Sequence, residues 1–263
     1  MECVLQTRAL TKCFQHKVAV DHVNMNIPAG EIYGFIGRNG AGKTTLMRMI
    51  LSLALPTEGD FQLFGEKASP RTARKIGALV ETPALYTNCS ARENLIRFGM
   101  LCGSDEKEAD RILDLVGLTG SGSKKVGRFS LGMKQRLGIG IALLGQPSFI
   151  VLDEPVNGLD PAGIQEIRNL ILHLNRDQGV SFLISSHLLD ELGKIATRFG
   201  IISRGRLVEE LSMQELNAKT EGKTRFVVDQ PQEAERLLRQ TLGDIPLLRQ
   251  EHALLLPEGT ADT

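Results

Sequence analysis

The sequence predicts an α/β fold: a parallel sheet covered by helices, an antiparallel β layer at the N-terminus, an inserted helical subdomain and a small C-terminal α+β extension. Two short, fully apolar segments, 149–152 and 182–184, flank segment 161–175, which has a helical pattern. Buried strands that alternate with helices are typical of a parallel sheet, because the crossover helices cover its faces. A further apolar segment, 32–36, leads directly into a glycine-rich loop.

The N-terminal region favours strands and turns. Apolar and β-branched residues predict strands at 4–7, 17–20 and 23–27, and Pro28-Ala29-Gly30 interrupts the last of them. We expect these strands to form the β layer beside the strand at 32–36.

The periodicity becomes helical between about residues 90 and 146. Ser90 and Glu93 have the spacing of a capping box, which predicts a helix start. Segment 105–116 carries apolar residues at helical positions, and Gly117 suits its C-terminal end. We interpret this block as a helical subdomain inserted into the core.

The character of the sequence changes again near residue 222. The patterns predict a strand at 224–228, a helix at 232–241 and another strand at 253–256. We therefore divide the chain into a main domain, 1–221, and an α+β extension, 222–263, whose last residues 258–263 we expect to be disordered. The extension carries no recognisable chemistry and is interpreted as a packing or dimer-supporting element.

The composition restricts the possible partners. The 263 residues are 42% hydrophobic and 24% charged, which allows one substantial core with one or two subdomains. Basic and acidic residues both number 31, which does not favour nucleic acid as a partner. No apolar stretch approaches the roughly 20 residues that cross a bilayer, and the first residues lack the pattern of a signal peptide, so we expect a cytosolic chain. The four cysteines have no metal-ligand spacing and are expected to be reduced thiols.

The glycine-rich loop predicts a site for a nucleoside triphosphate. Its sequence is Gly37-Arg38-Asn39-Gly40-Ala41-Gly42-Lys43-Thr44, and a helical pattern follows it until Pro56. Glycines let successive backbone N–H groups converge on phosphate oxygens, while Lys43 reaches the β- and γ-phosphates and the Thr44 hydroxyl can ligate Mg²⁺.

Asp153 and Glu154 come directly after the apolar segment 149–152. Because parallel strands present their carboxyl ends at one edge of the sheet, we expect both carboxylates beside the phosphate loop. Asp153 would hold Mg²⁺, and Glu154 would orient and polarise the attacking water. The alternative is a pair of solvated acids at a strand end, and the phosphate loop favours catalysis over it.

Three further features gain meaning from this context. His187 follows the strand at 182–184, where an imidazole can contact the γ-phosphate or the water, although a lone histidine is more often structural. Segment 157–161 predicts a turn into a helix, with Asp160 as its N-cap. Ser130 and Gly132 lie at another helix start, whose N-terminus can bind phosphate oxygens.

Taken in chain order, these motifs resemble an ABC transporter ATP-binding subunit over roughly residues 2–215. The resemblance implies a P-loop NTPase core of RecA-like fold that binds ATP and Mg²⁺ and hydrolyses the ATP. It also implies a second ATPase subunit, an identical copy, arranged head to tail so that each ATP lies between one subunit's phosphate loop and the other's signature helix. Separate transmembrane permease subunits would hold this pair at the cytoplasmic face of the membrane.

The resemblance also implies a role for each matching residue. The implied catalytic residues are Glu154 and His187; the implied Mg²⁺ ligands are Thr44, Asp153 and Glu81; and the signature is Ser130 with Gly132. Asp160 matches the D-loop. The implied nucleotide ligands are Phe14, which would stack on adenine, and Gly37, Asn39, Gly40, Ala41, Gly42, Lys43, Thr44 and Thr45.

Three departures from the family pattern concern the site. In the usual signature, Leu-Ser-Gly-Gly-Gln, Leu131 here replaces the first glycine and Met133 replaces the glutamine. Glu81 replaces the glutamine of the Q-loop; a carboxylate can ligate Mg²⁺ but cannot donate an N–H, and it adds negative charge beside the γ-phosphate. Segments 80–86 and 129–133 resemble the bacterial branch of bacitracin-resistance and lantibiotic-immunity exporters, which implies export of a peptide antibiotic.

Three hypotheses follow. The first is the ATPase subunit of an exporter, either of a peptide antibiotic or of other drugs and small molecules. The second is a soluble ABC protein of translation or DNA repair; a single phosphate loop, no long heptad stretch and no basic patch argue against it. The third is a regulatory module that hydrolyses slowly or not at all, which Glu81 and the altered signature suggest and which Glu154 and His187 oppose.

Overall fold

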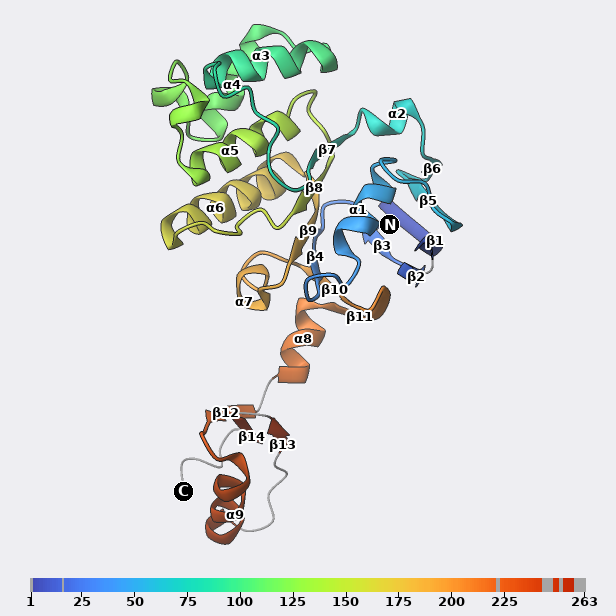
Figure 1. The fold of residues 1–263 in the computed structure, drawn as a ribbon, viewed down its shortest axis with the longest axis vertical. Helices are drawn as coiled ribbons and strands as arrows, with labels where there is room; N and C mark the ends of the chain where they lie inside the picture. Colours follow the sequence, from blue (N-terminus) through green and yellow to red (C-terminus); the bar gives the residue numbers. More distant parts are fainter. Residues whose placement is uncertain (1, 16, 221–222, 243–247, 251–252, 258–263) are drawn as a thin grey trace. The chain divides into compact units, whose positions relative to one another are not determined.

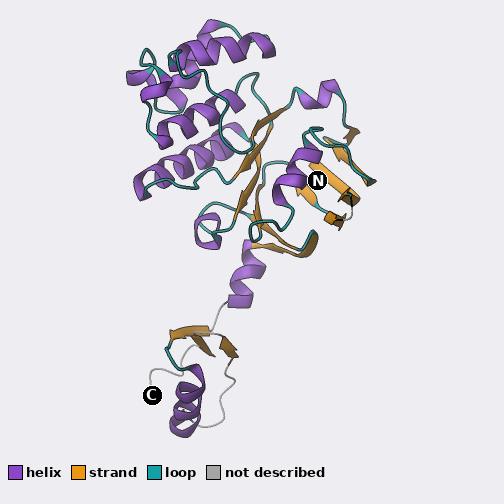
Figure 2. Ribbon diagram, in the orientation of Figure 1, coloured by secondary structure: helices purple, strands orange, loops and turns teal. Residues whose placement is uncertain are grey.

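The computed structural model describes residues 2–15, 17–220, 223–242, 248–250 and 253–257. The chain divides into two compact units, Met1–Leu211 and Ser212–Thr263. The first unit therefore ends before residue 221, where the sequence places the domain boundary. Figure 1 shows the elements of each unit, and Figure 2 shows that helices and strands occur in both.

The described part of the first unit contains a six-stranded sheet in the order β11-β10-β4-β9-β8-β7. Neighbouring strands from β10 to β7 run parallel, which confirms the predicted α/β class. Strands β8 and β9 are buried along their whole length, as expected for strands covered on both faces. The strands of this sheet are β4 (Ile32–Ile36), β7 (Ile76–Leu79), β8 (Phe149–Asp153), β9 (Ser181–Ser186), β10 (Arg198–Ser203) and β11 (Arg206–Ser212).

An antiparallel sheet forms the predicted N-terminal layer. Its strands are β1 (Cys3–Phe14), β2 (Lys17–Val23), β3 (Asn26–Pro28), β5 (Glu58–Leu63) and β6 (Glu66–Lys67). All of the pairings between them are antiparallel. The strand predicted at 23–27 is wrong in its limits, because Val23 ends β2 and β3 begins at Asn26. Strands β5 and β6 were not predicted, because the half-exposed run EGDFQL and the exposed pair Glu66-Lys67 carry little apolar pattern.

Helix α1 (Lys43–Ile50) contacts strands of both sheets, β2 and β8. Leu46, Met47 and Met49 are buried in a core that joins residues of the two sheets. The helix ends at Ile50 although the apolar pattern continues toward Pro56. Leu53 is 70% exposed, so no packing holds that residue in a further turn of helix.

The helical region contains α3 (Ala91–Cys102), α4 (Glu106–Leu115) and α5 (Leu131–Ala142), which contact one another. In Figure 1 they gather at one end of the first unit. The predicted capping box is confirmed: the Ser90 hydroxyl accepts from the Glu93 backbone, and the Glu93 carboxylate accepts from the Ser90 backbone. The other helices of this unit are α2 (Pro70–Ala73), α6 (Pro161–Gln178) and α7 (Leu189–Leu192).

The second unit is a small α+β element. Strands β12 (Lys223–Val227), β13 (Leu248–Gln250) and β14 (Ala253–Pro257) pair antiparallel in the order β12-β14-β13, and helix α9 (Pro231–Leu242) packs on β13 and β14. Helix α8 (Met213–Thr220) precedes them. The segment 258–263, predicted to be disordered, lies outside the described residues. Among the described helices, none has the length and apolar character of a transmembrane span.

Candidate nucleotide-binding site

The phosphate loop joins the end of β4 to the start of α1. Its conformation depends on glycine at two positions. At Gly42 the backbone has a φ of 112°, and a Cβ would lie 2.5 Å from the carbonyl oxygen of Ala19; at Gly37 a Cβ would lie 2.6 Å from that of Ile202. A side chain at either position would therefore displace backbone. Lys43 begins α1 and donates from Nζ to the Gly37 carbonyl at 2.5 Å, so its ammonium lies over the loop.

Asp153 lies at the end of β8, directly opposite Ser185 of β9. The Thr44 hydroxyl donates to Asp153 Oδ2 at 2.7 Å, and the Ser185 hydroxyl donates to Oδ1. A hydroxyl and a carboxylate are thus adjacent, which fits the oxygen ligands that Mg²⁺ uses together with substrate phosphates. Within the described residues, no three histidine, cysteine or acidic side chains are arranged so that they could hold a metal ion together.

Glu154 lies between two nitrogen-bearing side chains. Its Oε1 is 3.2 Å from Lys43 Nζ, and its Oε2 is 2.8 Å from His187 Nδ1. Its backbone has a φ of 49°, a left-handed conformation uncommon outside glycine, and its N–H donates to the Ser185 hydroxyl at 3.0 Å. Because Oε1 is buried and has no hydrogen-bond partner among the described residues, the carboxylate keeps a lone pair for a further donor. A water molecule is such a donor, so the arrangement suits a carboxylate that orients water.

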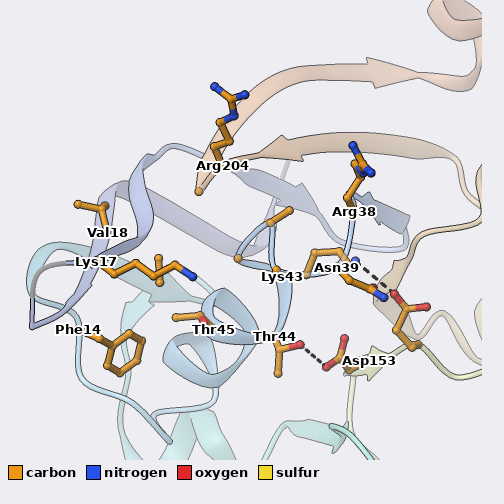
Figure 3. Close-up of a pocket in the computed structure, with 16 residues that line it drawn as sticks. Phe14, Lys17, Val18, Arg38, Asn39, Lys43, Thr44, Thr45, Asp153 and Arg204 are labelled. Atoms are coloured by element: carbon orange, nitrogen blue, oxygen red, sulfur yellow. Dashed lines mark hydrogen bonds and ion pairs between the residues drawn. The ribbon is translucent and has the colours of Figure 1, made fainter. Parts of the chain in front are cut away.

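A cavity of about 690 Å³ opens beside these groups (Figure 3). This volume is typical of a small-molecule site. Phe14, which is 52% exposed, lines the cavity at the end of β1, on the side away from the carboxylates. Of the residues that the sequence analysis proposed for nucleotide binding and catalysis, Phe14, 39–45, Asp153 and Glu154 line the cavity, whereas Gly37 and His187 do not. It missed Lys17, Val18, Ala19, Arg38, Arg204 and Gly205 as lining residues.

The missed turn at Arg204-Gly205 connects the two sheets at the phosphate loop. The Gly205 N–H donates to the Ala41 carbonyl at 2.9 Å, and the Asp21 N–H donates to the Gly205 carbonyl at 2.8 Å. Arg206 Nε lies 2.6 Å from Asp21 Oδ2. The pKa of the Asp21 carboxyl is lowered, mainly by its hydrogen bond with the His22 ring and secondly by that with Arg206. A glycine between two strands indicates a turn, but no local pattern predicts the contact of Gly205 with the backbone of Ala41, far earlier in the chain.

The predicted signature and D-loop residues do not line this cavity. Ser130 caps α5 by accepting from the Met133 N–H at 3.2 Å, and Asp160 caps α6 by accepting from the Gly163 N–H at 3.1 Å. A Cβ on Gly132 would have Leu159 Cδ2 at 3.9 Å as its nearest neighbour, so the start of α5 is open. The structure therefore brings together the phosphate loop, the carboxylates and His187, but leaves Ser130 and Gly132 outside.

Glu81 also lies outside the cavity lining. It has a φ of 65° and follows the end of β7. Its carboxylate is paired with the guanidinium of Arg48 on α1, and the two side chains are 60% and 46% exposed. No local pattern predicts this partner, because Arg48 lies on α1 and Glu81 follows β7.

A phosphate loop between a buried strand and a helix, next to a hydroxyl, a carboxylate and a cavity of this size, defines the class of P-loop nucleotide-binding proteins. The model of the ABC transporter family matches residues 20–157. The chain is 44% identical to the bacitracin transport ATP-binding protein BcrA of Bacillus licheniformis, over 91% of this chain and 80% of that protein. It is 42% identical to the lantibiotic transport ATP-binding protein SrtF of Streptococcus pyogenes, over 79% of this chain and 90% of that protein.

A solved structure agrees with the sequence relatives. The ADP conformation of an ATP-binding cassette of an ABC transporter superposes with a TM-score of 0.75 at 26% identity, covering 82% of this chain and 94% of that one. The chain therefore belongs to the ABC transporter family, as one of its ATP-binding ATPase subunits. The resemblance inferred from the motifs is confirmed.

Proposed function

We propose that this chain hydrolyses ATP to drive the export of a peptide antibiotic of the bacitracin or lantibiotic kind. The observation that carries the hydrolytic part is the position of Glu154 between Lys43 and His187, next to the Thr44–Asp153 pair. The names of two relatives above 40% identity support this cargo over other drugs. Cargo selection would lie in separate membrane subunits.

In this proposal each side chain has one task. Phe14 stacks on the adenine ring, backbone N–H groups of the loop at 37–45 hold the phosphates, and Lys43 turns from Glu154 to the β- and γ-phosphate oxygens. Glu154 then accepts a hydrogen bond from the attacking water, and His187 holds the carboxylate in position through the 2.8 Å contact.

Thr44 and Asp153 are the residues that would hold Mg²⁺, and Glu81 is a further candidate ligand. The ion would supply positive charge to the phosphate oxygens. The protein contributes the fixed positions of these oxygen ligands, since Asp153 is buried and is held by both Thr44 and Ser185.

The active form proposed here is a head-to-tail homodimer. Ser130 and Gly132 lie outside the cavity of their own chain, at the open start of α5, so in this arrangement they would meet the nucleotide of a second copy. Transmembrane permease subunits would hold the dimer at the cytoplasmic face of the membrane. Residues 1–221 would form the ATPase domain, with residues about 90–146 as its helical subdomain, and 222–263 would be an accessory extension.

Glu154→Gln tests the catalytic part of the proposal. The amide keeps the size of the side chain but loses the negative charge, so we expect magnesium-dependent phosphate release to fall about 100-fold or more while ATP still binds. Glu58→Gln at an exposed position of β5 is the matched control and should hydrolyse at the wild-type rate. Undiminished hydrolysis by Glu154→Gln would contradict the assignment.

The cargo is tested in cells that produce this chain together with candidate permeases. We expect the minimal inhibitory concentration of bacitracin or of a lantibiotic to rise, and the rise to disappear with Glu154→Gln. If the cells are protected against unrelated small drugs but against neither peptide class, the peptide cargo is refuted and the alternative, a multidrug exporter, is supported.

A further inference from the structure

We propose that Arg48 is the internal counter-charge of Glu81, which allows this nucleotide site to work with a carboxylate where the family usually has a neutral glutamine. The inference rests on the proposed function of the site. It assigns to Arg48 a positioning role, since Arg48 does not line the cavity and reaches the nucleotide only through Glu81.

The sheet register places a third carboxylate at the phosphate edge. Strand β7 runs parallel to β8, and Leu79 is level with Leu152. Glu81 follows Leu79 by two residues, as Glu154 follows Leu152, so the chain leaves both strands at the same edge of the sheet. Neighbouring strands are about 4.8 Å apart, which brings the two acidic segments close together.

Each carboxylate at this edge has polar partners of its own. Asp153 accepts from two hydroxyls, and Glu154 lies beside Lys43 and His187. Glu81 is paired with Arg48. When a triphosphate binds, Lys43 is required by the phosphates, so it cannot also neutralise Glu81. Arg48 does not line the cavity, so it stays available to Glu81 when the phosphates take Lys43.

The position of Arg48 on α1 suits this role. Helix α1 begins at Lys43, and Arg48 lies in its last turn, so the guanidinium is carried by the same helix that presents Lys43 and Thr44 to the phosphates. The pair also joins that helix to the segment after β7, in which Glu81 has a left-handed backbone. Without Arg48, a negative side chain at this edge would repel the incoming phosphates.

The test measures nucleotide affinity without metal, by displacement of a fluorescent ATP analogue in EDTA at low ionic strength. We expect Arg48→Met to weaken ATP binding about fivefold, and ADP binding less, because ADP carries less charge. Glu81→Gln should bind ATP at least as tightly as the wild type. The double variant Arg48→Met/Glu81→Gln should return to the affinity of Glu81→Gln, because no carboxylate is left to neutralise.

Three comparisons make the result decisive. Arg48→Lys keeps the charge and should bind like the wild type, while Arg71→Met removes an exposed arginine on α2 and should change nothing. The defect of Arg48→Met should shrink in 0.5 M salt, which screens exposed charges. Equal weakening in Arg48→Met and in the double variant, or no weakening in either, would overturn the inference. Failure of the wild type to bind ATP would instead refute the proposed function.

Discussion

The phosphate-loop face and the signature-helix face of this subunit differ in how complete they are. At the phosphate loop, segments from β1, β2, α1, β8 and the β10–β11 turn surround one cavity. At the start of α5, Ser130 and Gly132 contact their own helix and leave open space. One chain thus contains most of a nucleotide pocket at the phosphate loop. Separately, it exposes the start of α5, a surface that in the proposed dimer would complete the pocket of the second copy.

The strongest test of this difference combines one variant from each face. Lys43→Ala damages the phosphate loop, and Gly132→Arg fills the open start of α5; each alone should lose ATP hydrolysis by about 100-fold or more. A one-to-one mixture should recover about a quarter of the wild-type rate, since half of the dimers are mixed and each contains one intact composite site. The measurement is phosphate release against mixing ratio. A mixture as inactive as its components would refute the shared-site arrangement.

The next effect concerns only the phosphate-loop face. Gly42→Ala places a Cβ at 2.5 Å from the Ala19 carbonyl in a backbone with a φ of 112°, so we expect the free energy of unfolding to fall by about 1–3 kcal/mol and ATP affinity to fall at least tenfold. Gly40→Ala is the matched control, because its φ is also positive but nothing lies within 4 Å of the new Cβ. Denaturant unfolding should therefore rank Gly40→Ala between the wild type and Gly42→Ala.

A smaller effect is expected at the adenine end of the cavity. Phe14→Ala should weaken ATP and ADP binding alike, by about tenfold, because stacking of a base on an aromatic ring contributes about 1–3 kcal/mol. Phe14→Tyr should retain the wild-type affinity. Stability should hardly change in either variant, because the ring is 52% exposed. Calorimetric titration distinguishes these outcomes, and unchanged affinity in Phe14→Ala would remove the ring from the site.

The smallest effect lies in the helical subdomain, away from both faces. Ser90→Ala removes the N-cap of α3 and should lower the free energy of unfolding by about 1 kcal/mol without changing ATP affinity. The Ser90 backbone N–H lowers the pKa of Glu93, so the contribution of Glu93 is present above its unfolded-state pKa and is lost as the pH falls through the folded-state value. Ser90→Ala keeps this N–H and loses only the Ser90 side chain, the second cause of the lowered pKa. Unfolding curves at neutral and acidic pH should therefore show both proteins losing stability in acid and only a small part of the difference between them disappearing.

The sequence predicted the elements whose signals are local. The phosphate loop, the strand–helix alternation and the capping box at Ser90 each depend on neighbouring residues, and the structure contains all three. The strands β5, β6, β10 and β11 were missed. Strands β5 and β10 pair with β1 and β4, which lie far away in the sequence, and β6 and β11 extend the two sheets by pairing with β5 and β10. The same holds at the site, where the roles of Ser185 and Arg204-Gly205 arise from contacts that no local pattern encodes.

Glu81 shows the limit of motif reasoning in another way. The motif places a carboxylate at the Q-loop position and predicts extra negative charge beside the phosphate. The structure adds the pairing with Arg48, a residue of α1 that the phosphate-loop pattern does not include. The effect of a residue that differs from the family pattern, such as Glu81, can therefore be judged only together with the side chain that it contacts.

The turn at Gly205 has a consequence for synthesis of the chain. The phosphate loop is complete in sequence at residue 44, yet its Ala41 carbonyl is bound by Gly205, and Ile202 lies against Gly37. At about 5–20 residues per second, a ribosome needs on the order of ten seconds to add the missing segment. The phosphate-loop sequence of a nascent subunit is therefore synthesised well before Ile202 and Gly205, which contact its backbone. We expect the folded loop, and with it ATP binding, only after almost all of the first unit has left the ribosome.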